Sequence, residues 1–190
     1  MAALGNIAGW SAALTFYFFK CDQALLDRRL HGGPWAKGEP AQKRIQLFAT
    51  IFILVLVVAS ALDYRFGWSM VPAPIVLLGN ALVAIGFAIV FLVLRENSFA
   101  AATIEVTADQ RVISTGPYAL VRHPMYAGVL VLFLGVPPAL GYWRGLLAIL
   151  PVVAGLVARL QDEEAYLARN LPGYEEYRRK VRYRLVPGVW

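Results

Sequence analysis

The sequence predicts an all-α polytopic membrane protein with about five transmembrane helices. Hydrophobic residues make up 59% of its 190 residues, against about 45–50% in soluble domains. The chain also contains five long stretches without a charge: residues 2–19, 45–62, 71–94, 125–140 and 145–158. Because a membrane-spanning helix needs about 20 apolar residues, each stretch is expected to cross the bilayer, the last two as a hairpin.

The first two stretches are ordinary candidates for membrane helices. Residues 2–19 are closed by Lys20, with no basic residue before them and no small-x-small cleavage site after them. A transmembrane helix is therefore a better interpretation than a cleaved signal peptide. A polar connector, residues 20–44, turns at Gly-Gly-Pro 32–34 and leads to residues 45–62, which are rich in Ile, Leu and Val.

The third stretch contains 24 uncharged residues, 71–94. Pro72 and Pro74 lie near its start, where a helix tolerates proline. Asn80 is its one strongly polar interior residue, and in a membrane helix such a side chain more often bonds a neighbouring helix than a ligand.

The fourth and fifth stretches are short. The 16 residues at 125–140 reach about 24 Å, less than the hydrocarbon core of about 30 Å. Pro137, Pro138 and Gly141 predict a turn before residues 145–158. We expect a tight hairpin, extended at its ends by aromatic residues: Tyr126, Tyr142 and Trp143.

The basic residues predict the orientation. Sixteen of the 18 Lys and Arg fall in residues 20–44, 95–124 and 159–190, while Arg65 and Arg144 fall on the other side. Loops rich in Lys and Arg stay in the cytoplasm, so the N-terminus is expected outside and the C-terminus inside. This asymmetry accounts for the net charge of +6 without nucleic acid as a partner. With Cys21 as its single cysteine and two histidines, the sequence predicts neither an internal disulfide nor a metal site.

Polar chemistry gathers at the start of the fourth stretch. Pro124 suits the first position of a helix, because the amide that it lacks would have no partner there. The amides at a helix N-terminus form an anion site, which the neighbouring Arg122 strengthens. A Gly-Pro turn before Tyr118 directs this ring back toward the same place. The alternative is that these basic and aromatic residues only anchor the helix at the lipid head groups.

A second polar group lies where the fifth stretch leaves the membrane. Arg159 and Glu163 are four residues apart and share a helix face. Arg159 lies at the edge of the apolar run, where a charge is costly and usually functional, although an ordinary surface pair is the alternative. Both polar groups are expected on the cytoplasmic face, where they can form a pocket for a soluble zwitterionic cofactor. Residues 174–182 are expected to form a basic helix on the head groups.

These two groups resemble motifs of one enzyme family. The first is Gly116-Pro117-Tyr118 with Arg122-His123-Pro124-x-Tyr126-x-Gly128, and the second is Glu163-Glu164-x-x-Leu167, Gly173-Tyr174, Tyr177 and Pro187. In these motifs the chain is similar to the isoprenylcysteine carboxyl methyltransferase (ICMT) family and its phospholipid methyltransferase relatives. The resemblance covers residues 95–190, which we take as the catalytic region after three N-terminal spans in residues 1–94.

The resemblance implies an integral membrane enzyme that binds S-adenosylmethionine without a Rossmann domain, and the chain has no G-x-G-x-x-G fingerprint. Arg159, facing the methyl acceptor, and Glu163 are the implied catalytic residues. Gln110 stands where the eukaryotic prenylcysteine enzymes have a histidine. Carried over by position, the implied cofactor-binding residues are Gln110, Arg111, Val112, Ile113, Tyr118, His123, Pro124, Met125, Tyr126 and Glu163.

The expected reaction transfers a methyl group to the carboxylate of a prenylcysteine-like, lipophilic acceptor. A sulfonium methyl is already electrophilic, so in-line approach and exclusion of water suffice, without a metal. The amides around His123 would take the cofactor carboxylate, Tyr118 its adenine and Glu163 its ammonium or ribose. Arg159 would hold the acceptor carboxylate, which is ionised at pH 7.

Three alternatives stay open. The first is a methyltransferase whose acceptor is a phospholipid amine or a small thiol. Such an acceptor would need a base, for which Glu163, Glu164 and Tyr126 are the local candidates. A nicotinamide-dependent membrane lipid reductase is the second, because some sterol reductases are distantly similar in this region. The third is a membrane scaffold without activity.

Overall fold

The computed structural model describes residues 2–23, 25, 40–97, 99 and 110–190, and every regular element among them is a helix. This confirms the predicted all-α class. The turn at 32–34 and most of the connector that contains it lie outside the described residues. The elements are α1 (Ala2–Cys21), α3 (Pro40–Phe66), α4 (Ala73–Glu96), η1 (Gly116–Ala119), α5 (Pro124–Ala139), η2 (Trp143–Ala148), α6 (Ile149–Asn170) and α7 (Tyr174–Lys180).

Most helices extend beyond the uncharged stretches that predicted them. α3 begins five residues before position 45 and ends four after position 62, and α6 continues past position 158 to Asn170. The reason is that hydrophobicity marks what can face lipid, whereas backbone hydrogen bonding continues into polar sequence. α6 ends where Pro172 and Gly173 follow, and Gly173 takes the left-handed φ of +84° before α7 begins.

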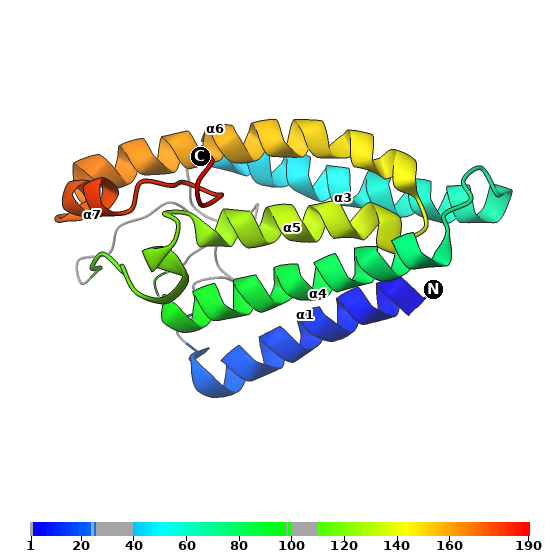
Figure 1. Cartoon of the computed structure of the whole chain (residues 1–190), viewed down its shortest axis with the longest axis horizontal. Coiled ribbons are helices and arrows are strands. Elements are labelled where there is room, and N and C mark those ends of the chain that lie inside the picture. Colours follow the sequence, from blue (N-terminus) through cyan, green and yellow to red (C-terminus); the bar gives the residue numbers. More distant parts are fainter. Residues whose placement is uncertain (1, 24, 26–39, 98, 100–109) are drawn as a thin grey trace.

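The long helices run along the long axis of the molecule in Figure 1, where α1, α4, α5 and α6 follow one another from bottom to top and α3 lies partly behind α6. α6 turns back beside α5 after η2. α7 and the C-terminal residues lie at the end of the bundle where α5 begins and α6 ends. The two polar groups that the sequence predicted, around Pro124 and around Glu163, therefore gather at one end.

The tightest helix contact joins α4 and α5 through glycines. A Cβ placed on Gly135 of α5 would lie 2.7 Å from the Gly79 carbonyl oxygen, and one on Gly86 would lie 2.8 Å from the Leu132 amide nitrogen. Small residues allow helix backbones to approach this closely in membrane proteins. α5 is thus fixed by α4 as well as by its hairpin partner α6, a contact that hydropathy alone did not predict.

Asn80 also serves helix packing. Its Nδ2 donates to the Val76 carbonyl at 2.8 Å, and its Oδ1 accepts a hydrogen bond from Asn6 of α1 at 3.2 Å. The prediction that Asn80 bonds a neighbouring helix is confirmed.

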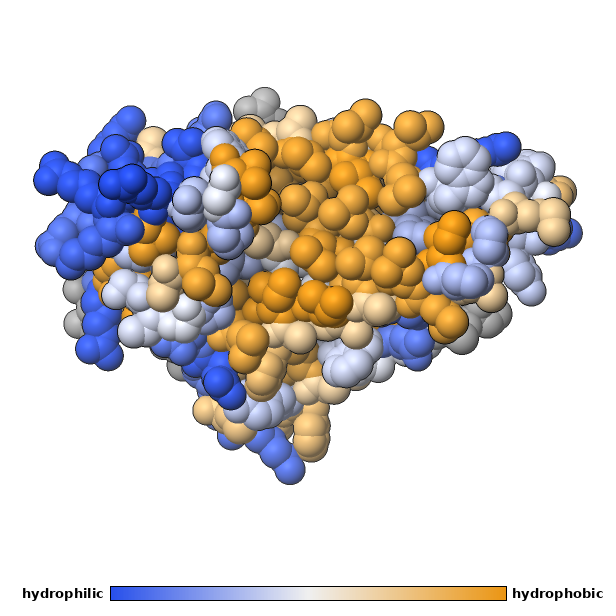
Figure 2. Space-filling model, viewed as in Figure 1, coloured by the Kyte–Doolittle hydropathy of each residue, from blue (hydrophilic) through white to orange (hydrophobic). Residues whose placement is uncertain are grey.

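The outer surface of the bundle is apolar. Figure 2 shows a hydrophobic band across the middle of the molecule and a hydrophilic surface at the end that carries α7. Such a band would be a liability in water. Within the described residues, α4 and the stretch Trp143–Asn170 are long and apolar enough to cross a membrane, and α5 is shorter. Large apolar side chains exposed on α3, α4, η2 and α6 include Ile51, Leu54, Val58, Leu77, Leu78, Ile85, Leu147 and Leu150.

Candidate active site

The N-terminus of α5 is anchored by the C-terminal segment of the chain. Pro124 is the first residue of α5 and His123 is its N-cap, as the sequence predicted. The backbone amides of Arg122 and His123 donate to the carbonyls of Tyr183 and Arg184, each at 2.9 Å. The amide of His123 is therefore engaged, and the anion site predicted at this helix start loses one of its donors.

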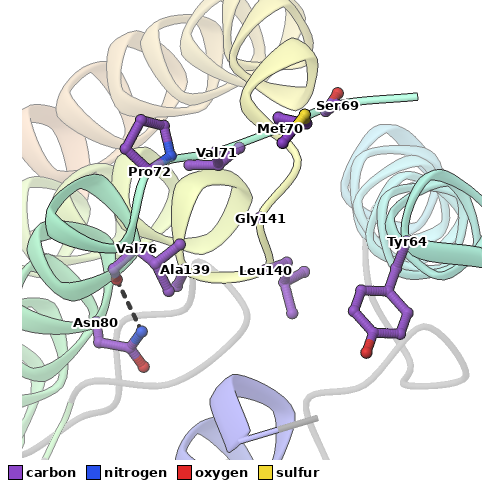
Figure 3. Close-up of a pocket in the computed structure, with 10 residues that line it drawn as sticks. All are labelled: Tyr64, Ser69, Met70, Val71, Pro72, Val76, Asn80, Ala139, Leu140 and Gly141. Atoms are coloured by element: carbon purple, nitrogen blue, oxygen red, sulfur yellow. Dashed lines mark hydrogen bonds between the residues drawn. The ribbon is translucent and has the colours of Figure 1, made fainter. Parts of the chain in front are cut away.

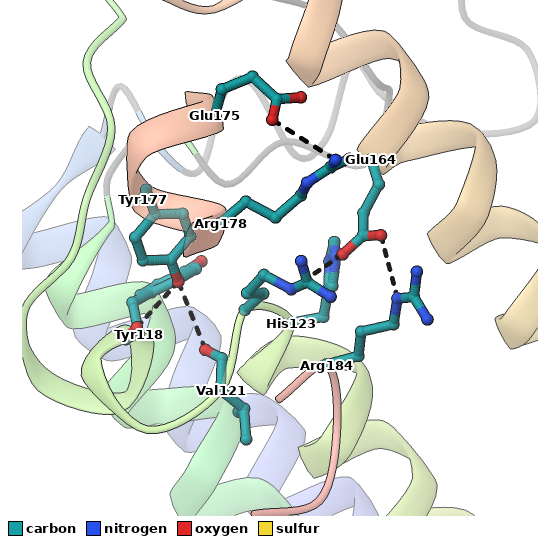
Figure 4. Close-up of polar contacts among 9 residues, drawn as sticks. Tyr118, Val121, His123, Glu164, Glu175, Tyr177, Arg178 and Arg184 are labelled. Atoms are coloured by element: carbon teal, nitrogen blue, oxygen red, sulfur yellow. Dashed lines mark hydrogen bonds and ion pairs between the residues drawn. The ribbon is translucent and has the colours of Figure 1, made fainter. Parts of the chain in front are cut away.

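Glu164 is the centre of a buried ionic cluster (Figure 4). Its Oε1 lies 3.0 Å from Arg122 Nε and 3.2 Å from His123 Nε2, and its Oε2 accepts a hydrogen bond from Arg184 Nε at 3.0 Å. The Glu164 side chain is only 5% exposed. A buried carboxylate is tolerated when several charged or polar partners surround it. Glu164 thereby ties α6 to the start of α5 and to the C-terminal segment.

The two predicted catalytic residues meet through a tyrosine. Arg159 Nε of α6 donates to Tyr126 Oη at 3.0 Å, and Tyr126 in turn donates to Glu163 Oε2 at 2.5 Å. Tyr126 comes from the first turn of α5, and its ring stacks on that of His123 with centroids 5.7 Å apart. The structure thus brings Arg159, Glu163, Tyr126 and His123 together from the two motifs.

Tyr118 is held by one residue that follows α4 and by one residue of α7. Asn97, just after α4, donates from Nδ2 to Tyr118 Oη at 2.9 Å, and the Tyr177 hydroxyl of α7 donates to the Tyr118 carbonyl at 2.8 Å. Burial raises the pKa of Tyr177 far above its ordinary value, so its hydroxyl remains a donor at neutral pH. Tyr118 therefore has a fixed place beside the corner between α6 and α7.

The predicted segment 110–113 covers this corner. Val112 packs with Tyr118 against the buried cluster formed by Leu171, Tyr174 and Tyr177. Gln110 and Ile113 are half-buried, whereas Arg111 is exposed. Burial raises the pKa of Tyr174, and the nearby charges of Glu164 and Glu163 raise this pKa further.

Comparison with known proteins identifies the family. The model of the phospholipid methyltransferase family matches residues 74–172, which is 99 of 190 residues. The chain belongs to the phospholipid methyltransferase family. The match runs from α4 through the end of α6 and includes both the Tyr126–Glu163 contact and Arg159. It confirms the predicted resemblance and, with it, a methyltransferase as the class of enzyme.

The chain is also similar to a curated methyltransferase. It is 39% identical over 75 residues to the protein-S-isoprenylcysteine O-methyltransferase of Schizosaccharomyces pombe. The aligned region is 38% of this chain and 32% of that relative, so the chain spans about a third of the relative's length.

Two buried polar atoms at this candidate site lack a hydrogen-bond partner within the described part of the chain: Tyr174 Oη and Arg122 Nε. Arg122 Nε has the charge of Glu164 nearby, but its N–H is not aligned with the carboxylate. A buried donor without a partner costs about 1–3 kcal/mol, so such atoms favour a polar ligand. Carboxylate and hydroxyl oxygens are acceptors of the kind that these donors can bind.

Sequence reasoning left several members of the site unassigned. Glu164 was considered only as a candidate base and not as the centre of an ionic cluster, Tyr174 stood in the motif without a role, and Asn97 and Arg184 carried no signal of their own. Among the described residues, no group of three His, Cys, Asp or Glu side chains is placed to hold a metal.

The Tyr177 hydroxyl should support the site through folding stability. We expect Tyr177→Phe to lower the free energy of unfolding by about 1 kcal/mol, because the Tyr118 carbonyl loses its donor. Thermal unfolding of the purified protein in detergent measures this. Tyr183→Phe, a change at a more exposed ring, is the control, and an equal loss in both variants would contradict the assigned role.

Proposed function

We propose that this chain is an integral membrane methyltransferase that uses S-adenosylmethionine to methylate the carboxylate of a prenylcysteine-like acceptor. The observation that carries the proposal is the chain of hydrogen bonds from Arg159 through Tyr126 to Glu163. It joins the two motifs at the boundary between the apolar band and the polar end. We further propose five spans with this end in the cytoplasm, residues 1–94 as membrane scaffold and residues 95–190 as the catalytic region.

The cofactor-binding part of the proposal rests on the donors around α5. Tyr174 Oη and Arg122 Nε would bind the carboxylate end, and Tyr118, oriented by Asn97, would lie against the adenine beside residues 110–113. Glu163 would accept from the ammonium or the ribose. Bound S-adenosylmethionine supplies an electrophilic methyl group, so these residues have to orient it and keep water out.

The acceptor is placed by Arg159. Its guanidinium is oriented by the bond to Tyr126 and lies near the edge of the apolar face of α6. A guanidinium recognises a carboxylate by parallel hydrogen bonds, and an acceptor with a prenyl chain would enter from the lipid. A carboxylate acceptor loses no proton, so no base is needed at pH 7.

The Tyr126–Glu163 bond also favours a second candidate, an acceptor that loses a proton. Tyr126 already donates to Glu163, so the pair could take a proton from a thiol or from the amine of a phospholipid. The family description names phospholipids, and the relative in Schizosaccharomyces pombe is named for isoprenylcysteine.

Methyl transfer from labelled S-adenosylmethionine to three acceptors tests these candidates. The panel is a prenylcysteine, a small thiol and an aminophospholipid, each with the purified protein in lipid vesicles. We expect methylation of the prenylcysteine, lowered about 10²–10³-fold in kcat/KM by Glu163→Gln, because loss of a positioned polar group costs this much. Glu175→Gln, at an exposed glutamate paired with Arg178, is the matched control.

The outcomes separate the alternatives. Methylation of the thiol or the phospholipid alone would favour the second candidate. Reduction of a sterol with a reduced nicotinamide, without methylation of any acceptor, would support the reductase. Equal rates for Glu163→Gln and Glu175→Gln would show that the acidic residue at position 163 has no part in the reaction.

A further inference from the structure

A cavity lies at the opposite end of the bundle from Glu164. It has a volume of about 560 Å³, within the range of ligand-binding sites. Its walls come from the end of α3, the loop into α4, the first half of α4 and the turn after α5. Figure 3 shows Tyr64, Leu140 and Asn80 arranged around one space. The methyltransferase site accounts for none of these residues.

The chemistry of the wall suits an apolar occupant. Six of the ten lining residues are apolar side chains or proline: Met70, Val71, Pro72, Val76, Ala139 and Leu140. Two polar lining residues are engaged within the protein, since Ser69 donates to Asp63 and Asn80 bonds both Val76 and Asn6. These side chains therefore do not require hydrogen bonds from a ligand.

The surroundings of the cavity are those of a membrane interface. Tyr64 is 80% exposed at the wall, and Trp68 stacks on Phe66 with ring centroids 5.2 Å apart. Trp143 is exposed at the start of η2. Aromatic rings of this kind mark the level of the lipid head groups. An occupant at this depth has its apolar part in the cavity and its polar part beside these rings.

The charge at this end is positive. Arg65 follows the wall residue Tyr64, and Arg144 lies three residues after the wall residue Gly141; both arginines are exposed. The nearby Asp63 is buried and accepts the Ser69 hydroxyl. These two exposed cations, close in sequence to the wall, complement the phosphate of a lipid, and the apolar wall complements its acyl chain.

We propose that this cavity binds an acyl chain of an anionic phospholipid whose phosphate is held by Arg65 and Arg144. A zwitterionic lipid offers the same chain, but its cationic head group partly cancels the attraction. Each arginine near a lipid surface contributes about 1 kcal/mol, which corresponds to about fivefold in affinity. The preference for anionic over zwitterionic lipid is therefore expected to be about fivefold or more.

Native mass spectrometry of the full chain in detergent tests the proposal with phosphatidylglycerol and phosphatidylcholine of identical acyl chains. The wild type is expected to retain one phosphatidylglycerol in preference to phosphatidylcholine. Arg65→Gln combined with Arg144→Gln should remove the preference. Val76→Phe should reduce retention of both lipids, because its ring fills the cavity. Met70→Glu, at a side chain 93% exposed and so tolerant of change, should selectively repel phosphatidylglycerol.

A matched control separates this site from the basic residues at the other end. Arg179→Gln combined with Arg182→Gln removes two exposed cations there and should leave unchanged the retention of the one phosphatidylglycerol that Val76→Phe removes. Loss of phosphatidylglycerol in this control, but not in the Arg65 and Arg144 variant, would overturn the proposal. Retention at the wild-type level in both Val76→Phe and Met70→Glu would also overturn it, as would displacement of the lipid by a prenylcysteine.

Discussion

Glu164→Ala is expected to lower the free energy of unfolding by about 3–5 kcal/mol. The carboxylate is buried among Arg122, His123 and Arg184. Without it, buried positive charge has no counter-charge, and the three segments that meet at Glu164 lose their common partner. Denaturant titration of the purified protein in detergent, followed by tryptophan fluorescence, measures the change. Cofactor affinity should fall as well, because His123 and Arg122 lose their fixed positions.

The neighbouring glutamate supplies the comparison. Glu163 accepts a hydrogen bond from Tyr126 and is only half-buried, so Glu163→Ala is expected to cost about 1 kcal/mol of stability while abolishing methyl transfer. Substitution of Glu164 should therefore affect mainly folding stability, and substitution of Glu163 mainly methyl transfer. Equal destabilisation by the two substitutions would contradict the central place given to Glu164.

Gly135→Leu is expected to destabilise the protein by about 3 kcal/mol or more. A Cβ at this position would lie 2.7 Å from the Gly79 carbonyl oxygen and 2.8 Å from the Val83 amide nitrogen. Both are backbone atoms of α4, so the contact cannot be relieved by a change of rotamer. α5 would have to move away from α4, and Tyr126 would move with it. The midpoint temperature of thermal unfolding and the rate of methyl transfer should both fall.

Gly155→Ala is the matched glycine substitution on α6. No atom lies within 4 Å of the Cβ that it would add, and alanine favours a helix over glycine by about 1 kcal/mol. This variant should be as stable as the wild type or slightly more so. Similar losses at positions 135 and 155 would show that helix glycines are sensitive in general, and that close packing of α4 on α5 is not the cause.

The helices and much of the candidate site could be predicted from the sequence, because both leave a pattern in neighbouring residues. Long uncharged stretches predicted all the long helices among the described residues, and Pro124 predicted the start of α5. The spacing of Arg159 and Glu163 placed both on one face, and the structure joins them through Tyr126. The number of spans rests on the uncharged stretches and the orientation on the positions of the basic residues, and both stay predictions.

The features that the sequence did not predict depend on contacts between residues that are far apart in the sequence. Arg184 reaches Glu164 because the C-terminal segment folds back onto the start of α5, and no local pattern near position 184 indicates this. Asn97 bonds Tyr118 across 21 positions. To predict the glycine contact between α4 and α5, one must know which helices are neighbours. Hydropathy does not contain that information.

Isothermal titration calorimetry with S-adenosylhomocysteine tests the central claim most directly. The wild-type protein in detergent should bind one equivalent, and Glu163→Ala should weaken binding by about tenfold or more, the effect of losing a hydrogen bond to a charged group. Glu175→Gln should bind as the wild type does. Absence of binding to the wild type, together with saturable binding of a reduced nicotinamide, would contradict a methyltransferase that uses S-adenosylmethionine.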